Sequence, residues 1–279
     1  MQGDVPKTLP RATFLGSGTS QGVPIIGCSC EVCHSDDPRD HRLRCSLWVE
    51  VGGKSVVIDT GPDFRIQMLR ERVQSLDAVV YTHEHKDHLA GMDDIRPFNF
   101  LQRTVMPIYA SERVEAALHR DFHYAFEPNK HGGVPDVDIR LIEGDRAFEL
   151  GEATWQPLPL MHAELPIHGY RVEGLAYITD ANHIPNDTWG LLDGVDTLVV
   201  NALRPSPHYS HFSLDEALDV ARHVGARQTY LTHISHLMGL HSERNATLPE
   251  GISLAFDGLQ LERRDQEWHP TNRQHAWTL

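Results

Sequence analysis

The sequence has no long hydrophobic run: no window approaches the roughly 18 uninterrupted apolar residues that mark a membrane-spanning helix. The N-terminal stretch holds no apolar segment of the kind found in secretory signals, so we expect a cytoplasmic protein with no membrane partner. Linkers, low-complexity blocks and internal repeats are also missing, which favours one folded domain over residues 1–279. Only the tail, from about 265 to 279, is expected to be poorly ordered.

Positive charge is scarce. Lys and Arg together number 25 against 39 Asp and Glu, which leaves a formal net charge of −14. That balance argues against a protein held to nucleic acid by a basic face, so nucleic acid is not expected as a partner. The remaining composition, with 40% hydrophobic and 23% charged residues, is typical of a globular protein.

Cysteine is also rare, with 4 copies, but Cys28, Cys30 and Cys33 stand together. In this C-x-C-x-x-C spacing the thiols are too close for an ordinary disulfide framework. Thiolates so placed converge on one Zn²⁺, which takes four tetrahedral ligands, so one ligand must come from elsewhere. A set of buried free thiols is the alternative. Cys45 starts the apolar run CSLWVEV and is expected in the core.

The pattern along the chain favours a β-sandwich flanked by helices. Gly-rich turns predict hairpins around 52–53 and around 257–258. Ser111 and Ser213 are predicted N-caps of two amphipathic helices. The segment 123–134 is aromatic, Gly-rich and aperiodic, which is typical either of a plain loop or of an active-site lid.

Histidine, by contrast, is abundant, with 19 copies, and its densest cluster is the segment THEHKDH. The segment directly follows the strand-like run DAVVY, so one loop at the end of that strand carries the candidate ligands His83, His85, Asp87 and His88. In H-x-H both imidazoles point to the same side of an extended backbone. This set exceeds what one catalytic metal can use while it keeps an open position. We therefore expect two metals, one on His83 and His85 and the other on Asp87 and His88, with a metal-free His-rich loop as the alternative.

Three further strand ends offer ligands: His162 after PLPLM, Asp180 after AYIT and His233 after YLT. Taken singly, each is an ordinary turn residue. Two-metal hydrolases also use a bridging carboxylate, and all three residues follow short apolar runs that could end at one edge of a sheet. Together with the His cluster they predict a common site.

The order of motifs along the chain, GSGTSQG, VVIDTG, THEHKDH, MH, ITD and LTH, resembles the metallo-β-lactamase superfamily. The resemblance implies an αββα sandwich of α/β (α+β) class with a di-metal site at one edge. It implies that one metal is held by His83, His85 and His162, the other by Asp87, His88 and His233, and that Asp180 bridges them. Asp59, in the VVIDTG segment, matches a buried aspartate that supports a ligand from behind.

The cysteine cluster after G-x-G-x-x-Q-G-V-P is similar to that of the PhnP-type cyclic phosphodiesterases in this superfamily. This resemblance implies that His236 joins Cys28, Cys30 and Cys33 in a structural Zn²⁺ site. It implies a hydrolase for a small phosphodiester, such as a cyclic ribose phosphate or a nucleotide, attacked by a hydroxide that two Zn²⁺ or Mn²⁺ ions activate. Fe²⁺ is a third candidate metal.

The leaving group of such a reaction needs a proton. His211, directly before a predicted helix, matches the position of the general acid of that family, and His208 is the reserve. Alternatively, His211 is only a helix-end residue. Asp87 is expected to be a catalytic residue as well as a metal ligand. Relatives in this family often dimerise, so a homodimer is one expected assembly.

Three other functions remain open at this stage. The same site geometry serves lactone or thioester hydrolysis. A tRNA 3′-processing nuclease shares the motifs, but the net charge of −14 argues against it. A non-hydrolytic PqqB-like protein of quinone-cofactor biosynthesis shares the cysteine motif, but the full ligand set favours hydrolysis.

Overall fold

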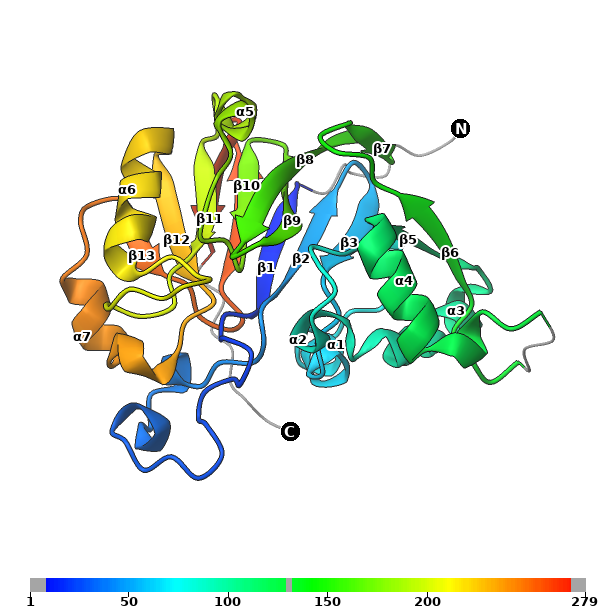
Figure 1. Cartoon of the computed structure of the whole chain (residues 1–279), viewed down its shortest axis with the longest axis horizontal. Coiled ribbons are helices and arrows are strands. Elements are labelled where there is room, and N and C mark those ends of the chain that lie inside the picture. The colour runs from blue at the N-terminus through cyan, green and yellow to red at the C-terminus, as the bar shows by residue number, and fades with distance from the viewer. Residues whose placement is uncertain (1–8, 129–131, 272–279) are drawn as a thin grey trace, which may run out of the picture.

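The computed structural model describes residues 9–128 and 132–271, which form two β-sheets packed face to face (Figure 1). Within these residues the first sheet has the strand order β15-β14-β1-β2-β3-β4-β5-β6 and the second the order β13-β12-β11-β10-β9-β8-β7. The strands are β1 (Arg11–Gly16), β2 (Ser46–Val51), β3 (Lys54–Ile58), β4 (Ala78–Val80), β5 (Met106–Ala110), β6 (Val137–Leu141), β7 (Phe148–Leu150), β8 (Ala153–His162), β9 (Leu165–Val172), β10 (Leu175–Ile178), β11 (Thr197–Asn201), β12 (Gln228–Thr232), β13 (Ile252–Leu254), β14 (Gln260–Arg264) and β15 (Glu267–Pro270).

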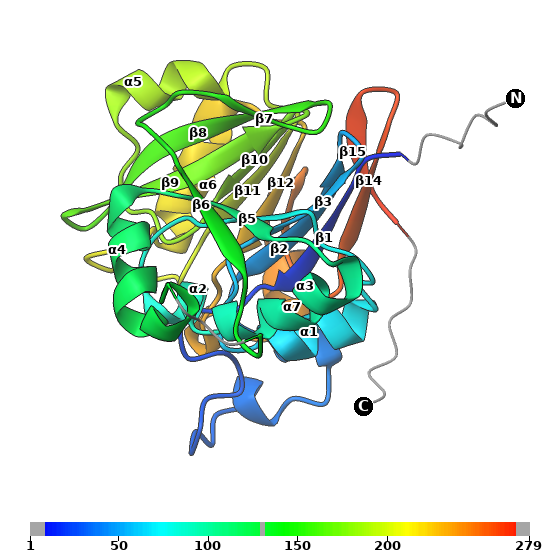
Figure 2. The ribbon, with the colours of Figure 1, turned by 90° about the vertical axis from the view of Figure 1, so that its right-hand side faces the viewer.

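Helices cover the outer faces of both sheets. In the described residues they are α1 (Phe64–Glu71), α2 (Lys86–Leu89), α3 (Arg96–Gln102), α4 (Glu112–Asp121), α5 (Asn186–Trp189), α6 (Leu214–Val224) and α7 (His241–Ala246). Helices α1 to α4 pack on the first sheet and α5 to α7 lie on the side of the second (Figures 1 and 2). The four layers are helix, sheet, sheet, helix, so the αββα sandwich is confirmed.

The central core lies between the sheets and contains Phe14, Trp155, Tyr177 and Trp268, all with no exposed surface. Alternation along each strand explains how it is filled. In β2, for example, Leu47, Val49 and Val51 face this core while the side chains between them face the helices or solvent. Two further cores separate each sheet from its helices, because a sheet covered on both faces needs apolar residues on both.

Parallel pairing brings several strand ends to one edge of the sandwich. Strands β3 to β6 pair in parallel, and so do β10 to β13. Strand β8 is antiparallel to β9, which is antiparallel to β10, so β8 ends at the same edge as β10. The loops that follow β3, β4, β8, β10 and β12 therefore meet, and they carry the candidate ligands.

Two expectations for the C-terminal part are wrong. Residues 257–258 do not close a hairpin, because β13 pairs with β12 in the second sheet and β14 pairs with β1 in the first. The chain crosses between sheets at Asp257, whose buried carboxylate accepts hydrogen bonds from the amides of Ser17 and Leu43 at 2.9 Å each. The tail is ordered at least to Pro270, because β15 pairs with β14 and buries Trp268; residues 272–279 lie outside the described residues.

The segment 123–134 begins with one turn of 3₁₀-helix, in which the Tyr124 hydroxyl donates to Asp93 at 2.7 Å. Residues 129–131 of this segment lie outside the described part, so its role as a lid stays a prediction. None of the helices in the described ranges has the length and apolar character needed to cross a membrane.

Candidate metal centres

The H-x-H pair points its ring nitrogens at one place. His83 Nε2 and His85 Nδ1 lie 3.0 Å apart on the loop after β4. The ring of His162, the last residue of β8, lies 5.7 Å from that of His83 and 5.1 Å from that of His85, between centroids. The structure thus brings these three predicted ligands together from two strands of different sheets.

Asp180 stands between the remaining predicted ligands. Its Oδ2 lies 3.3 Å from His88 Nε2, and its Oδ1 lies 3.2 Å from His233 Nε2. Asp87 Oδ2 lies 3.2 Å from the same His88 nitrogen. Asp180 also lies within 4.8 Å of the ligand atoms of His83 and His162, so it touches members of both predicted ligand sets, as a bridging carboxylate requires.

Buried hydrogen bonds orient the imidazoles from behind. Asp59, directly after β3, accepts a 2.7 Å hydrogen bond from His88 Nδ1 and also the amide and hydroxyl protons of Thr82, each at 2.8 Å. Because the Thr82 hydroxyl donates to Asp59, its oxygen accepts from His83 Nδ1 at 2.9 Å. His162 Nδ1 donates to the Ser210 carbonyl at 2.7 Å. These contacts occupy the Nδ1 atoms of all three histidines and turn their Nε2 atoms toward the cluster.

Sequence reasoning missed Thr82 and Ser210 as orienting groups. Thr82 directly precedes H-x-H, so its position was a usable signal. Ser210 acts through its main-chain carbonyl, which has no sequence signature.

Three site residues adopt a left-handed backbone. Asp59, Asp180 and His233 have φ values of 64°, 59° and 54°, and each follows the end of a strand. This conformation is disfavoured for residues with a side chain and is found at functional sites, where surrounding contacts hold it. Here it turns each side chain from the strand direction toward the common centre.

Charge and burial set the protonation of the cluster. Burial lowers the pKa of His83 well below its usual value, and the positive charge of His88 lowers it further. Burial opposes protonation of His88 as well, but Asp87, Asp180 and Asp59 together raise its pKa well above the usual value. Against the effect of burial, His233 and His88 lower the pKa of Asp180 well below its usual value. Without a metal, Asp87 and Asp180 are thus ionised and the balancing positive charge sits on His88, and a bound metal cation would replace that proton.

The donor set fits divalent metal ions. Two ligands at about 2.1 Å from one ion lie about 3.0–3.4 Å apart in octahedral or tetrahedral geometry, and the N–O and N–N separations here are 3.0–3.3 Å. Both ring nitrogens of His233 are buried without a hydrogen-bond partner among the described residues, which is costly unless a ligand is bound. Imidazole and carboxylate groups accept Zn²⁺, Mn²⁺ or Fe²⁺.

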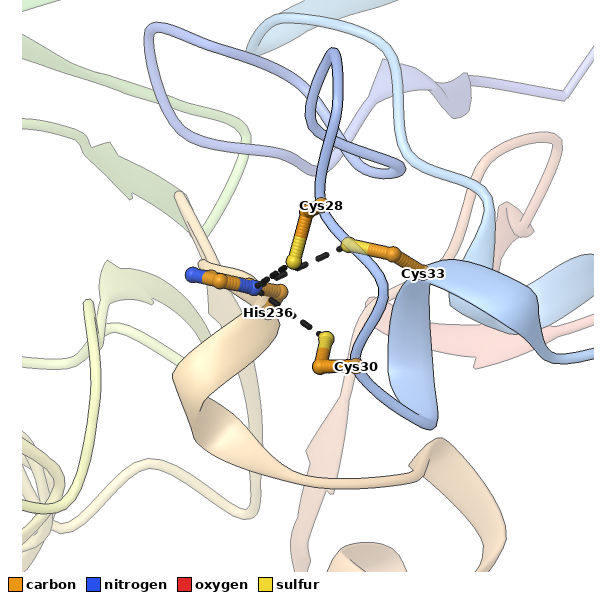
Figure 3. Close-up of side chains that lie close together, drawn as sticks. All are labelled: Cys28, Cys30, Cys33 and His236. Carbon is orange, nitrogen blue, oxygen red and sulfur yellow. Dashed lines mark hydrogen bonds between the residues drawn. The ribbon is translucent and has the colours of Figure 1, made fainter.

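A second cluster lies in the N-terminal loop, which projects from the sandwich (Figures 1 and 2). The sulfurs of Cys28 and Cys30 lie 3.3 Å, and that of Cys33 3.6 Å, from Nδ1 of His236 (Figure 3). Sulfur and nitrogen bound tetrahedrally to one Zn²⁺ are about 3.5 Å apart. None of the four cysteines is in a disulfide, and Cys45 is buried in the core as predicted. This donor set fits one closed zinc site.

His211 and His208 lie beside the Asp180 cluster, on the loop between β11 and α6. His211 Nδ1 is 3.8 Å from Asp180 Oδ1, and its ring centroid is 4.6 Å from those of His162 and His233. Burial and then the charge of His233 lower the pKa of His211 to about 3. The ring of His208 lies 5.2 Å from that of His211, farther from Asp180. The structure therefore places His211 at the cluster and His208 at its rim.

Comparisons with known proteins agree with this geometry. The model of the beta-lactamase superfamily domain matches residues 54–234. The crystal structure of a diphosphatase from the PhnP family superposes with a TM-score of 0.85 and 45% identity, over 91% of this chain and 96% of that chain. Zn²⁺-bound PqqB from Methylobacterium extorquens superposes with a TM-score of 0.73 over 90% of this chain and 99% of that one, but its 19% identity shows the fold alone.

Two curated relatives have other names. An octanoyltransferase of Porphyromonas gingivalis is 38% identical over 252 residues, which is 90% of this chain but 51% of that protein, so the chain spans about half its length. A Ribonuclease Z of a Mycobacterium species is 25% identical over 242 residues, which cover 76% of this chain and 83% of the relative.

Proposed function

The chain belongs to the beta-lactamase superfamily and, within it, to the PhnP family, and from this premise we propose that it hydrolyses phosphodiester or diphosphate bonds in small molecules with the help of divalent metals. One observation carries the proposal: the candidate ligands converge on both oxygens of Asp180 in a chain that is 45% identical to a diphosphatase of the PhnP family. That relative extends the expected substrates from esters of one phosphate to diphosphates.

Two divalent ions bound in this cluster would act as Lewis acids and lower the pKa of a bound water to near neutrality. The chain's own residues hold and orient the groups around them. Asp180 would bridge the two ions, because it lies within 4.8 Å of ligand atoms from both predicted sets, and Asp59 fixes His88 so that its Nε2 faces inward. His162 is fixed in the same way by the Ser210 carbonyl.

His211 is the proposed proton donor to the leaving oxygen. The site without substrate keeps it neutral, because burial and His233 lower its pKa to about 3. An anionic phosphoryl group bound beside the ring would raise that pKa toward the working range, because an opposite charge favours the protonated form. His208, at the rim, is the reserve donor.

The Cys₃His cluster is proposed to hold a structural Zn²⁺. A closed tetrahedral site has no open position for a substrate, and its donors join the N-terminal loop to the segment after β12. It would therefore stabilise the fold near His233 without taking part in the chemistry.

A ribonuclease is the second candidate function, because the 25% identity to Ribonuclease Z extends over 76% of this chain. The net charge of −14 disfavours binding of a long polyanion, which makes it the weaker candidate. The octanoyltransferase relative keeps the thioester alternative open, but its name describes a protein about twice as long.

A substrate panel with metal-stripped and reconstituted protein tests the proposal. It includes bis(p-nitrophenyl) phosphate, a 2′,3′-cyclic nucleotide, a ribosyl 1,2-cyclic phosphate and ADP-ribose, with a lactone, an acyl thioester and a tRNA precursor as comparisons. We expect turnover of small phosphodiesters or diphosphates that requires added metal. Preferential cleavage of the tRNA precursor, the lactone or the thioester would replace the proposal with that alternative.

Asp180→Ala should abolish this turnover and reduce bound metal while the fold is retained, because the sandwich core does not depend on that carboxylate. Asp187→Ala removes an exposed carboxylate from α5 and is the matched control, which should keep both properties. Wild-type turnover in Asp180→Ala would refute the assignment of the site.

A further inference from the structure

We propose that the loop between β11 and α6 is the substrate-recognition element, in which Arg204 and His208 bind a second anionic group and Tyr209 stacks on an aromatic ring. The inference rests on the proposed function and deepens it: the substrate would be a nucleoside diphosphate or a compound of similar chemistry. The loop spans residues 202–213, and its sequence from Arg204 to His211 is RPSPHYSH.

The loop is fastened to the candidate catalytic centre at several points. The Ser210 carbonyl accepts from His162 Nδ1 at 2.7 Å, and the Tyr209 carbonyl accepts from the Asn182 side chain at 3.0 Å. The Phe212 amide donates to the carbonyl of Ala181, next to Asp180, at 2.8 Å. These contacts hold the loop at a defined position beside the ligands, so its side chains stand where the remainder of a bound substrate would lie.

Arg204 keeps its charge available. Its guanidinium donates only to two carbonyls of its own loop, those of Ser206 at 3.4 Å and Pro207 at 3.0 Å, and within the described residues no carboxylate pairs with it. In a chain of net charge −14, an uncompensated cation on the loop that carries His211 would attract an anionic substrate. A guanidinium also matches the geometry of phosphate oxygens.

His208 extends the line of donors outward from the centre. Its ring lies 5.2 Å from that of His211, and its Nδ1 accepts from the amide and hydroxyl of Ser210 at 3.4 Å and 3.3 Å. Within the described residues no hydrogen bond involves its Nε2, which is thus free to contact a ligand. The Arg204 guanidinium is hydrogen-bonded to the carbonyl of Pro207, directly before His208, so both side chains offer donors on the loop that carries His211.

Tyr209 is the most solvent-exposed aromatic side chain of the loop, with 80% of its surface accessible. Its ring packs against His208 at 4.7 Å between centroids, and only its main-chain carbonyl is hydrogen-bonded within the described residues. An exposed tyrosine fastened through its main chain next to two phosphate-binding groups is suited to stack on a base, because every base presents a π-face.

Calorimetric titration of the Zn²⁺-reconstituted protein with inorganic phosphate, AMP and α,β-methylene-ADP tests each part separately. In wild type we expect the affinity to rise from phosphate to AMP, through stacking, and again to α,β-methylene-ADP, through the second anion. Arg204→Ala should weaken the binding of α,β-methylene-ADP by about ten-fold or more, because it removes charge-assisted hydrogen bonds to the second anionic group only. The affinity for phosphate should stay unchanged. Tyr209→Ala should lower the affinity for AMP by about ten-fold, and Tyr209→Phe, which keeps the ring, should retain the wild-type affinity.

Arg65→Ala is the matched control: it removes an exposed arginine of α1 and should change none of the affinities. Metal content and melting temperature are measured for every variant, so that loss of metal or of fold is recognised. The inference is overturned if wild type binds α,β-methylene-ADP no more tightly than phosphate, or if Arg204→Ala and Tyr209→Ala bind like wild type. If the affinities rise as expected but no compound of the substrate panel is turned over, the proposed function is refuted while the proposed binding site is retained.

Discussion

His211 is the residue whose role is tested most directly by a change of substrate. An alkoxide leaving group needs a proton as its bond breaks, whereas p-nitrophenolate leaves unaided. His211→Ala should therefore lower the hydrolysis of an alkyl or cyclic-ribose phosphodiester by ~10²–10⁴-fold and affect a p-nitrophenyl ester far less, with metal content unchanged. Loss of both activities together with metal would make His211 a ligand, and no loss would make it a helix-end residue.

His241 should make the folded state sensitive to acid. It is buried, its Nδ1 accepts from the Arg42 guanidinium at 3.1 Å, and burial together with the Arg42 charge lowers its pKa to about 3. In the unfolded chain a histidine has a pKa near 6.5, so between about pH 6.5 and pH 3 the unfolded state binds the extra proton. The contribution of neutral His241 to the free energy of unfolding is complete above that window. It decreases as the pH falls through the window, by up to about 1.4 kcal/mol per pH unit.

His241→Asn keeps an acceptor for Arg42 but cannot titrate. Denaturant unfolding of metal-free wild type and variant between pH 7 and pH 4 measures the difference. We expect a shallower pH dependence of the unfolding free energy in the variant. Parallel slopes would show that another group carries the acid sensitivity.

At the scale of elements, the position of α2 depends on a close backbone approach. A Cβ atom at Gly61 would lie 2.3 Å from the carbonyl oxygen of Asp87, and one at Gly91 would lie 2.2 Å from that of Gly61. These glycines let the loop after β3 pack directly on the helix that carries Asp87 and His88. Main-chain contact therefore helps to set the ligand positions on α2.

Gly61→Ala should displace α2, with a loss of catalytic metal and about 1–3 kcal/mol of stability, as in other overpacked sites. Metal analysis and denaturant unfolding measure both effects. Gly190→Ala is the control, since a Cβ there has no atom within 4 Å. Full metal occupancy in Gly61→Ala would show that the loop can give way at little cost.

At the scale of the whole molecule, the Cys₃His cluster joins distant parts of the chain. It links the projecting N-terminal loop to His236, three residues after His233, and the Thr19 amide adds a 3.1 Å hydrogen bond to the carbonyl of Ile234 between them. A zinc ion there would therefore stabilise the surroundings of a catalytic ligand from outside the catalytic cluster.

Partial chelation should distinguish the two kinds of metal centre. Mild EDTA treatment should remove the catalytic metals first, because they have an open position, and leave about one Zn²⁺ per chain in the closed thiolate site. Metal analysis and melting curves follow the two steps, and the larger fall in melting temperature should accompany the second. A metal that stays after Cys28, Cys30 and Cys33 are blocked, or thiols found as disulfides, would contradict this reading.

Local patterns in the sequence were sufficient for the sandwich, for most strands and for the residues that meet at its edge. The N-caps at Ser111 and Ser213 form as predicted, because both depend on residues within one helical turn, and at Ser213 the structure adds a reciprocal bond from Glu216. The positions of His83, Asp180 and His233 also followed from strand ends, because parallel strands bring their ends to one edge. The binding of metal at these residues stays a prediction that the donor geometry supports.

Tertiary structure alone decided the features that depend on distant parts of the chain. The turn at 257–258 has the local chemistry of a hairpin, yet the Asp257 carboxylate finds partners near Ser17, and the two strands join different sheets. The tail becomes a strand because Trp268 fills the core between the sheets. The fastening of His162 by the Ser210 carbonyl and the exposure of Tyr209 likewise arise only when the loop is folded onto the sheet edge. Such contacts are set by three-dimensional proximity, which periodicity and local propensity do not encode.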